Sequence, residues 1–556
     1  MSSSDMSSSD SSRLSPWQKS TLRELMESGN SFLTAVELVN SRGVITERSG
    51  SGVILLARDL AQHPHIHALS ITDNPGGNAV LSADTLGTDL ISRGQEVIIH
   101  LSCKDWNRNA LQSHAWKLAS EGFDNILALS GDCPTAGYGG RAAGVFDTDS
   151  VGLLKMLSDM NSGMETRKPS GRRSRLERTR FFSGAVVNNF KRLESEVMPQ
   201  YFKLAEKIRV GADFIIEQIG YNARKQDELL RYMELKKIRV PVLANVYVLS
   251  RAAARHFSSG RIPGVTVSPE LLARVEKEAA SPDRGKAFFL EFAAQQCAVA
   301  KGLGYGGVYL GGHLKYEDYD HILALSRSYG TSDWKDFASE VNYDLPDEFY
   351  FFEPDADTGL NSAEINRRYL ASKRPKGLSS LRLRTSLTYR INRYLHDAFF
   401  VPGRLGFRIG RTLYGFAERV GGRLQRGLHL AEQVVKVPAF GCRDCGDCSL
   451  PDIAYLCPES QCAKNQRNGP CGGTLDGRCE VGDKECIWVR AYDRLKACGE
   501  EEGMLHRPVV YRDGSLAGTS AWANTFMERD HHGRARTPGP REQKRKSSQT
   551  RERIEG

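Results

Sequence analysis

The chain has 556 residues, of which 40% are hydrophobic and 26% are charged, and its formal net charge is +9. This length implies more than one domain, and the composition excludes a fibrous or wholly disordered protein. No apolar run reaches the roughly 20 residues of a membrane span, so we expect no transmembrane segment.

The start of the chain is rich in Ser and Asp and lacks both the basic and the apolar region of a secretory leader. We therefore expect residues 1–20 to be disordered. We also expect the protein to be cytoplasmic.

Short apolar and β-branched runs recur between residues 33 and 311, and amphipathic segments of helical length separate them. These runs are 33–39, 66–72, 96–101, 125–130, 182–187, 213–218, 240–246 and 307–310. Strands that alternate with helices pair in parallel through right-handed crossovers. Eight such units in about 300 residues predict a (β/α)8 TIM barrel. A doubly wound open sheet is the alternative, but no G-x-G-x-x-G motif follows the first strand.

Polar residues stand at the carboxyl ends of these strands, where a barrel keeps its active site. They are Glu37, Thr72, Asp73, His100, Gly131, Asp132, Asn188, Gln218 and Asn245. Glu37 has apolar neighbours, so desolvation should favour its neutral form and equip it to donate a proton. Asp132 lies in a turn, where backbone N–H groups can keep it ionised for an electrostatic role. Taken singly, each residue could be structural, but their shared position at one rim favours function.

A strongly basic segment follows the predicted barrel, which we assign to residues 21–330. Residues 367–426 hold 15 Lys and Arg against two acidic residues, a local balance of +13. We predict a basic helical connector over 331–440 that bridges two domains, with weak contact to anionic surfaces as the alternative. Residues 501–556 are expected to form a basic, largely disordered tail.

Nine of the chain's 12 cysteines lie between Cys442 and Cys498, a stretch without histidine. Without a secretory leader, such dense thiols indicate metal ligation rather than disulfides. All-sulfur ligation suits either zinc or an iron–sulfur cluster, and nine thiols are one more than two four-ligand sites need. We predict a cysteine-rich metal-binding domain over residues 441–500. Its predicted ligands are Cys442, Cys445, Cys448, Cys457, Cys462, Cys471, Cys479 and Cys486.

Several of these segments, in their order and spacing, resemble the methylenetetrahydrofolate reductase family. They are Ala35-Val-Glu37, Leu69-Ser-Ile-Thr-Asp-Asn74, His100-Leu-Ser-Cys103, Ile126-Leu-Ala-Leu-Ser-Gly-Asp132 with Pro134, and Gly211-Ala-Asp213 running to Gln218. The resemblance covers about residues 21–325. The cysteine region, with Cys457-Pro-Glu-Ser-Gln-Cys462 and Asn468-Gly-Pro-Cys-Gly-Gly473, is similar to the C-terminal domain fused or partnered to such reductases in some bacteria.

The resemblance implies an oxidoreductase acting on a CH–NH bond, which holds FAD on the barrel rim. It implies reduction of 5,10-methylenetetrahydrofolate to 5-methyltetrahydrofolate, or the reverse, in one-carbon metabolism. Glu37 would be the general acid that helps to open the folate ring, Asp132 would stabilise the resulting cation, and Gln218 would bind the folate. The residues implied to line the FAD are Thr72, His100, Gly131 and Asp132.

The chain departs from the family pattern at Ser130, where Arg is common, and over residues 187–190, where a Tyr and a His help to hold the flavin. The expected partners are the folate, a second copy of the chain, and an electron donor. That donor is either NAD(P)H or a protein such as ferredoxin, which would act through a cluster in the cysteine domain. A flavin-free scaffold subunit of a folate-linked methyl-transfer system is the alternative function.

Overall fold

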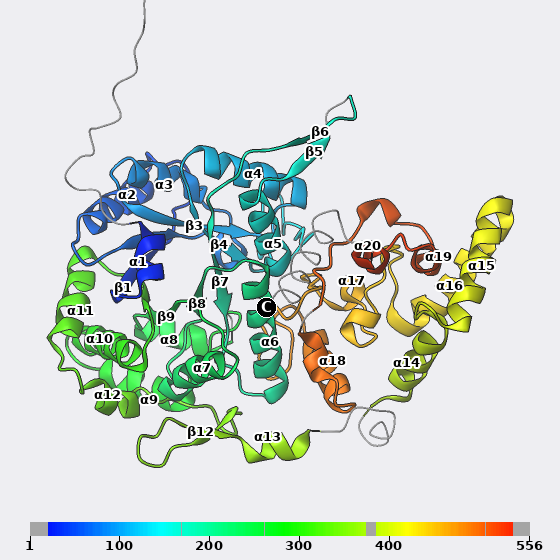
Figure 1. Cartoon of the computed structure of the whole chain (residues 1–556). Helices are drawn as coiled ribbons and strands as arrows, with labels where there is room; N and C mark the ends of the chain where they lie inside the picture. The colour runs from blue at the N-terminus through cyan, green and yellow to red at the C-terminus, as the bar shows by residue number, and fades with distance from the viewer. Residues whose placement is uncertain (1–20, 168–169, 261, 374–384, 506, 537–556) are drawn as a thin grey trace, which may run out of the picture.

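Figure 1 shows the computed structural model, which describes residues 21–167, 170–260, 262–373, 385–505 and 507–536. The expected disorder of residues 1–20 falls outside this range. A barrel with its helices, blue to green, lies beside the C-terminal third of the chain, yellow to red. In the described part of the chain, every helix is too short or too polar to cross a bilayer.

Eight parallel strands close into a barrel in the order β1-β10-β9-β8-β7-β4-β3-β2, which confirms the predicted TIM barrel. They are β1 (Leu33–Leu38), β2 (Ala68–Ile71), β3 (Glu96–Ser102), β4 (Asn125–Leu129), β7 (Phe182–Val187), β8 (Phe214–Glu217), β9 (Val242–Tyr247) and β10 (Gly307–Gly311). Pairing of Leu33 with Gly307 joins the first strand to the last. Each strand overlaps one predicted run, because apolar, β-branched segments of this length are buried on both faces in a barrel.

Helices connect the strands on the outside of the barrel. They are α2 (Arg48–Ala61), α3 (Ala83–Ile91), α4 (Arg108–Ser120), α5 (Ser150–Asn161), α6 (Glu194–Val210), α7 (Ala223–Leu235), α8 (Arg251–Ser258), α9 (Pro269–Glu278), α10 (Lys286–Leu303), α11 (Tyr316–Ser328) and α12 (Trp334–Glu340). Two hairpins, β5 (Glu165–Arg167) with β6 (Arg173–Arg175) and β11 (Phe352–Pro354) with β12 (Asn361–Ile365), lie outside the barrel sheet.

The short helix α1 (Leu22–Ser28) covers the amino-terminal end of the barrel. Its residues Leu22 and Met26 are buried in one cluster with Leu33, Phe182 and Phe214 of the strands. A barrel interior packed with apolar side chains is a core rather than a pore. The polar residues predicted to carry function are thereby left at the opposite end.

The C-terminal third is built from helices and loops, with no strand of the barrel sheet among its described residues. Its helices are α13 (Arg367–Ser372), α14 (Leu387–Phe399), α15 (Leu405–Val420), α16 (Gly422–Phe440), α17 (Pro458–Gln461), α18 (Ile487–Lys496), α19 (Ala521–Phe526) and α20 (His531–Arg536). Helix α18 packs on α6 of the barrel, where the Tyr492 hydroxyl donates to Glu194 Oε1 at 2.7 Å. The cysteine-rich region is therefore held against the barrel.

The segment after residue 500 differs from the expected disorder over its described part. Phe526 of α19 is buried with Phe407 and Tyr414 of α15. His531 of α20 is bonded to the buried Asp447. A few apolar side chains and one histidine fix this segment although its overall composition is polar. The remaining residues, 537–556, lie outside the described range.

Candidate active site and cysteine pockets

A cavity of about 290 Å³ lies at the carboxyl ends of the barrel strands. Every residue predicted to act in catalysis or to bind folate or FAD contributes to its wall. These residues are Glu37, Thr72, His100, Gly131, Asp132 and Gln218. The closed barrel brings them together because parallel strands all end at the same rim.

Glu37 lies in a hydrogen-bonded group inside the barrel mouth. The Tyr309 hydroxyl donates to Glu37 Oε2 at 3.0 Å, and its oxygen lies 3.2 Å from His100 Nε2. Burial raises the pKa of Glu37, which the hydrogen bond from Tyr309 opposes only in part. Burial also lowers the pKa of His100 to about 3, so its imidazole is neutral. The cavity therefore presents a carboxyl group that favours its protonated form beside an uncharged imidazole.

Asp132 lies at the rim rather than in the barrel interior. Its Oδ2 accepts a hydrogen bond from the Gly76 N–H at 3.2 Å. Its other oxygen, Oδ1, lies 3.9 Å from the ammonium group of Lys464, which the cysteine-rich region supplies. The neighbouring Gly131 has φ +82°, and a Cβ there would meet the Lys104 side chain at 2.8 Å. Glycine at this turn thus lets the backbone lie along the cavity wall.

Lys207 and Glu217 are buried titratable residues of the cavity that were not predicted from the sequence. Burial lowers the pKa of Lys207, on α6, to about 7. Burial also raises the pKa of Glu217, at the end of β8, to about 7, although Asn189 and Tyr305 both donate to it. Lys207 was missed because it lies in an amphipathic helix, where lysine is usually solvated. Glu217 directly precedes Gln218 at a strand end, and this position could have indicated that it lines the cavity.

The nine clustered cysteines divide into two groups of four and one separate thiol. The first pocket is lined by Cys442, Cys445, Cys448 and Cys457. The second is lined by Cys462, Cys471, Cys479 and Cys486. The ninth, Cys498, is buried elsewhere, with its sulfur 3.9 Å from the Tyr389 hydroxyl. All are free thiols.

Both pockets fit metal ligation by thiolates, because each offers four sulfurs and neither is lined by histidine. A buried lysine accompanies each group: Lys436 Nζ lies 3.5 Å from Cys448 Sγ, and Lys464 lines the second pocket. Four thiols without an imidazole suit either of the predicted centres, tetrahedral zinc or an iron–sulfur cluster.

The second cysteine pocket shares a wall with the barrel cavity. The residues common to both linings are Lys464, Cys471, Gly473 and Glu480. Lys464 and Glu480 form an ion pair in which each side chain is only 6% exposed. A metal centre in this pocket would therefore be next to the cavity that Glu37 and Asp132 line.

Two family models match the chain. One, described as methylenetetrahydrofolate reductase, matches residues 44–309, and the other, described as methylene-tetrahydrofolate reductase C terminal, matches residues 423–514. The chain belongs to the methylenetetrahydrofolate reductase family. The first match covers most of the barrel but begins after Glu37, and the second covers both cysteine pockets.

Solved structures of similar fold were also found, whereas no curated protein matches the chain. One is an uncharacterized protein from Clostridium thermocellum that binds two copies of 5-methyl-5,6,7,8-tetrahydrofolic acid. It is 12% identical, with a TM-score of 0.40 over 55% of this chain and 98% of that one. Another is 2,3-dimethylmalate lyase, 13% identical, with a TM-score of 0.30 over 52% of this chain and 77% of that one. Identities and TM-scores this low do not support any conclusion about the site.

In this reductase-family chain, the positions expected to depart from the family pattern contact the cysteine-rich region. The Ser130 hydroxyl donates to Gln466 Oε1 at 3.2 Å. The Asn188 amide, from the segment 187–190, donates to the Gly472 carbonyl at 3.0 Å. Both side chains are buried. Ser130 and Asn188 therefore serve the docking of a second domain on the rim.

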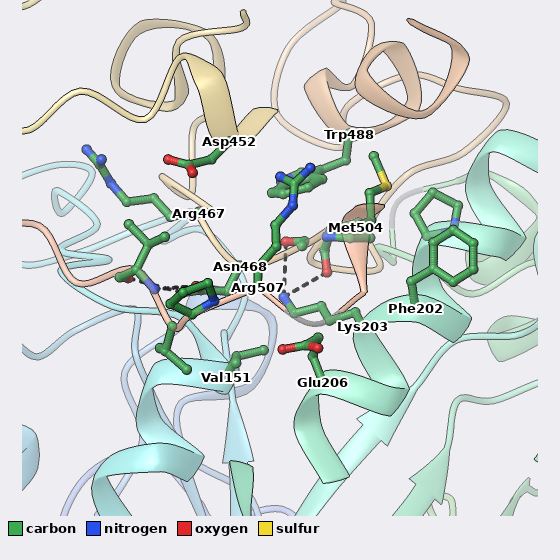
Figure 2. Close-up of a pocket in the computed structure, with 16 residues that line it drawn as sticks. Val151, Phe202, Lys203, Glu206, Asp452, Arg467, Asn468, Trp488, Met504 and Arg507 are labelled. Carbon is green, nitrogen blue, oxygen red and sulfur yellow. Dashed lines mark hydrogen bonds between the residues drawn. The ribbon is translucent and has the colours of Figure 1, made fainter. Parts of the chain in front are cut away.

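Further polar contacts fix the junction of the two parts, and Figure 2 shows some of them. Lys203 of α6 points at the carbonyls of Pro470 and Gly469, to which its ammonium group donates at 2.9 and 3.1 Å. Asn468 Oδ1 accepts from the Val510 N–H at 2.7 Å. The cavity between these residues is only about 30 Å³, too small for a cofactor. This junction is therefore a packed interface that holds the second cysteine pocket in place.

Proposed function

We propose that this protein is a flavin-dependent enzyme that interconverts 5,10-methylenetetrahydrofolate and 5-methyltetrahydrofolate. The observation that carries the proposal is the meeting of Glu37, inside the barrel mouth, and rim residue Asp132 at one cavity. Family membership supports the substrate class. The cavity also provides the two kinds of carboxyl group, one desolvated and one at the rim, that acid and electrostatic roles need.

Glu37 holds the proton that the reaction requires. Burial raises its pKa and so favours the protonated carboxyl, and the Tyr309 hydrogen bond fixes its orientation. Glu37 donates this proton to the folate nitrogen that leaves when the five-membered ring opens. Asp132 stabilises the iminium cation that results, and Gln218 binds the folate. In the reverse direction Glu37 takes the proton back.

Thr72, His100, Gly131 and Asp132 are the residues that would hold FAD. The donor set fits a flavin, because the cavity wall offers a neutral imidazole, a hydroxyl and the backbone of the Gly131 turn. When bound, FAD supplies hydride transfer to the carbon of the opened ring. The protein contributes position, water exclusion and charge.

We further propose that each cysteine pocket holds an iron–sulfur cluster, with zinc as the alternative. The all-thiolate lining of each pocket and the buried lysine beside each group support a cluster. When bound, clusters supply electrons one at a time. The wall shared by the second pocket and the barrel cavity supports a protein electron carrier as the donor rather than NAD(P)H. A flavin-free scaffold is less well supported. The expected departures at Ser130 and Asn188 were the feature that favoured it, and the contacts of both side chains with the docked domain offer another reason for them.

Anaerobic purification followed by absorbance spectra, iron, sulfide and zinc analysis, and a folate assay tests these proposals separately. The expected result is bound FAD, acid-labile sulfide, and formation of 5-methyltetrahydrofolate with a reduced one-electron dye. A protein that neither binds added FAD nor converts folate would overturn the reductase proposal. Zinc without iron would overturn the clusters and leave the reductase proposal standing.

A further inference from the structure

Helix α15 has an unusual division of its surface. One face is buried, where Phe407 and Tyr414 pack on the ring of Phe526 at centroid distances of 5.5 and 5.4 Å. A second face is apolar yet exposed. Its residues are Leu405, Ile409, Leu413, Phe416 and Val420. Their spacing of four, four, three and four residues places them in one stripe about 22 Å long.

The same property extends to the helices on either side. Of the 25 large hydrophobic residues that are exposed in the described part of the chain, 15 lie on α14, α15 and α16. On α14 they are Leu387, Ile391, Tyr394, Leu395 and Phe399, and on α16 they are Leu424, Leu430, Val434, Val435 and Val437. Helix α15 packs against both neighbours. Such a concentration marks a binding surface, because isolated exposed hydrophobic residues are scattered in ordinary proteins.

Arginines flank this apolar surface. Residues 385–440 contain nine Lys and Arg against three Asp and Glu, a net charge of +6. Seven of the arginines are exposed: Arg390, Arg404, Arg408, Arg411, Arg419, Arg423 and Arg426. Within the described residues, only Arg411 among these has an acidic partner, Glu528 at 3.7 Å. On α15 the helical spacing places Arg408 and Arg419 along one edge of the stripe.

The position of these helices leaves the surface accessible. Figure 1 shows α15 and α16 side by side at the end of the molecule that is remote from the barrel. The exposed stripe of α15 is also distinct from the face that packs on α19. The barrel therefore cannot cover it within one chain.

We propose that helices α14–α16 bind the surface of an anionic phospholipid bilayer. The apolar stripe would enter the boundary between headgroups and acyl chains, while the arginines reach the phosphates. A second copy of the chain fits less well, because it would set unpaired arginines against each other. Nucleic acid would leave the apolar stripe in water. Of these three partners, only a phospholipid bilayer would contact both the apolar stripe and the arginines.

Co-sedimentation of the full-length protein with vesicles tests this proposal. We expect binding to vesicles of phosphatidylcholine with phosphatidylglycerol, little binding to phosphatidylcholine alone, and partial loss at high salt. The double variant Ile409→Asp/Phe416→Asp should reduce partitioning by at least tenfold. Arg408→Gln/Arg419→Gln should reduce it by about 25-fold, since each arginine near the surface contributes about fivefold.

Matched controls are available on the barrel. Leu235→Asp and Arg239→Gln change an exposed leucine and an exposed arginine near the end of α7, and both should bind as the parent does. Circular dichroism and unfolding midpoints verify that each variant is folded. Absence of parent binding to the anionic vesicles, or equal binding by the double variants, overturns the proposal. A second outcome would assign the surface to another copy of the chain and also overturn the proposal. In it, light scattering shows a parent dimer that Ile409→Asp/Phe416→Asp dissociates, and neither protein binds vesicles.

Discussion

The Lys464 ammonium group lies 3.9 Å from Asp132 Oδ1, although the two residues belong to different parts of the chain. Lys464 also pairs with Glu480, and both side chains are almost completely buried. Lys464 follows Cys462 by two residues, and Glu480 follows Cys479 directly. The cysteine-rich region therefore completes the wall of the barrel cavity with charged residues that adjoin its own thiols.

Lys464→Met should destabilise the protein by about 3 kcal/mol, because it leaves the buried Glu480 carboxylate without its partner. Urea unfolding measures the loss. The double variant Lys464→Met/Glu480→Met should recover much of it, since no buried charge is then unpaired. A double variant as unstable as Lys464→Met would contradict the explanation that an unpaired Glu480 carboxylate causes the loss.

Glu37→Gln should leave the fold intact and reduce folate turnover by about 10²- to 10⁴-fold, the usual contribution of a general acid. The assay is formation of 5-methyltetrahydrofolate. Because burial raises the pKa of Glu37, its protonated fraction falls as the pH rises, so parent turnover should decline on the alkaline side. Tyr309→Phe keeps the carboxyl and removes only its hydrogen bond, and should cost less. Near-normal turnover by Glu37→Gln would place the acid elsewhere.

The division of the cysteines predicts a pattern of metal loss. Cys457→Ser and Cys471→Ser each change one ligand of a different pocket, so each should lose about half of the metal. Cys498→Ser should keep all of it, since this thiol lies apart. Metal content per chain is the measurement. Complete retention in Cys457→Ser, or loss in Cys498→Ser, contradicts the grouping.

His531 should make stability depend on pH. It is buried, and the carboxylates of Asp452 and Asp447 outweigh the opposing effect of burial and raise its pKa from 6.5 to about 10. Its contribution is therefore fully present below pH 6.5 and is lost as the pH rises toward 10. His531→Gln should lower stability at pH 6 by about 3 kcal/mol and abolish the decline.

The exposed His256 provides the control for this measurement. His256→Gln should unfold with the same pH dependence as the parent. Thermal unfolding between pH 6 and pH 10 gives the comparison. A decline that persists in His531→Gln would assign it to another group.

Some features of the site were open to sequence reasoning and others were not. Glu37 and Asp132 could be found because each ends an apolar strand, and a barrel gathers strand ends. Tyr309 lies within a predicted strand, and only the closed geometry turns its hydroxyl toward Glu37. Cys457 and Cys462 are separated by the single turn of α17, yet they line different pockets. Spacing alone could not divide them.

The sequence by itself determined the eight strands, the residues at their ends and the thiol character of the C-terminal region. Those properties depend on local periodicity and on residue type, and both can be obtained from the amino-acid sequence. Only the tertiary structure decided that the cysteine-rich region closes the barrel mouth, that its thiols form two groups, and that the connector leaves an apolar surface uncovered. These depend on which distant side chains pack together, and packing is settled by shape and burial in three dimensions.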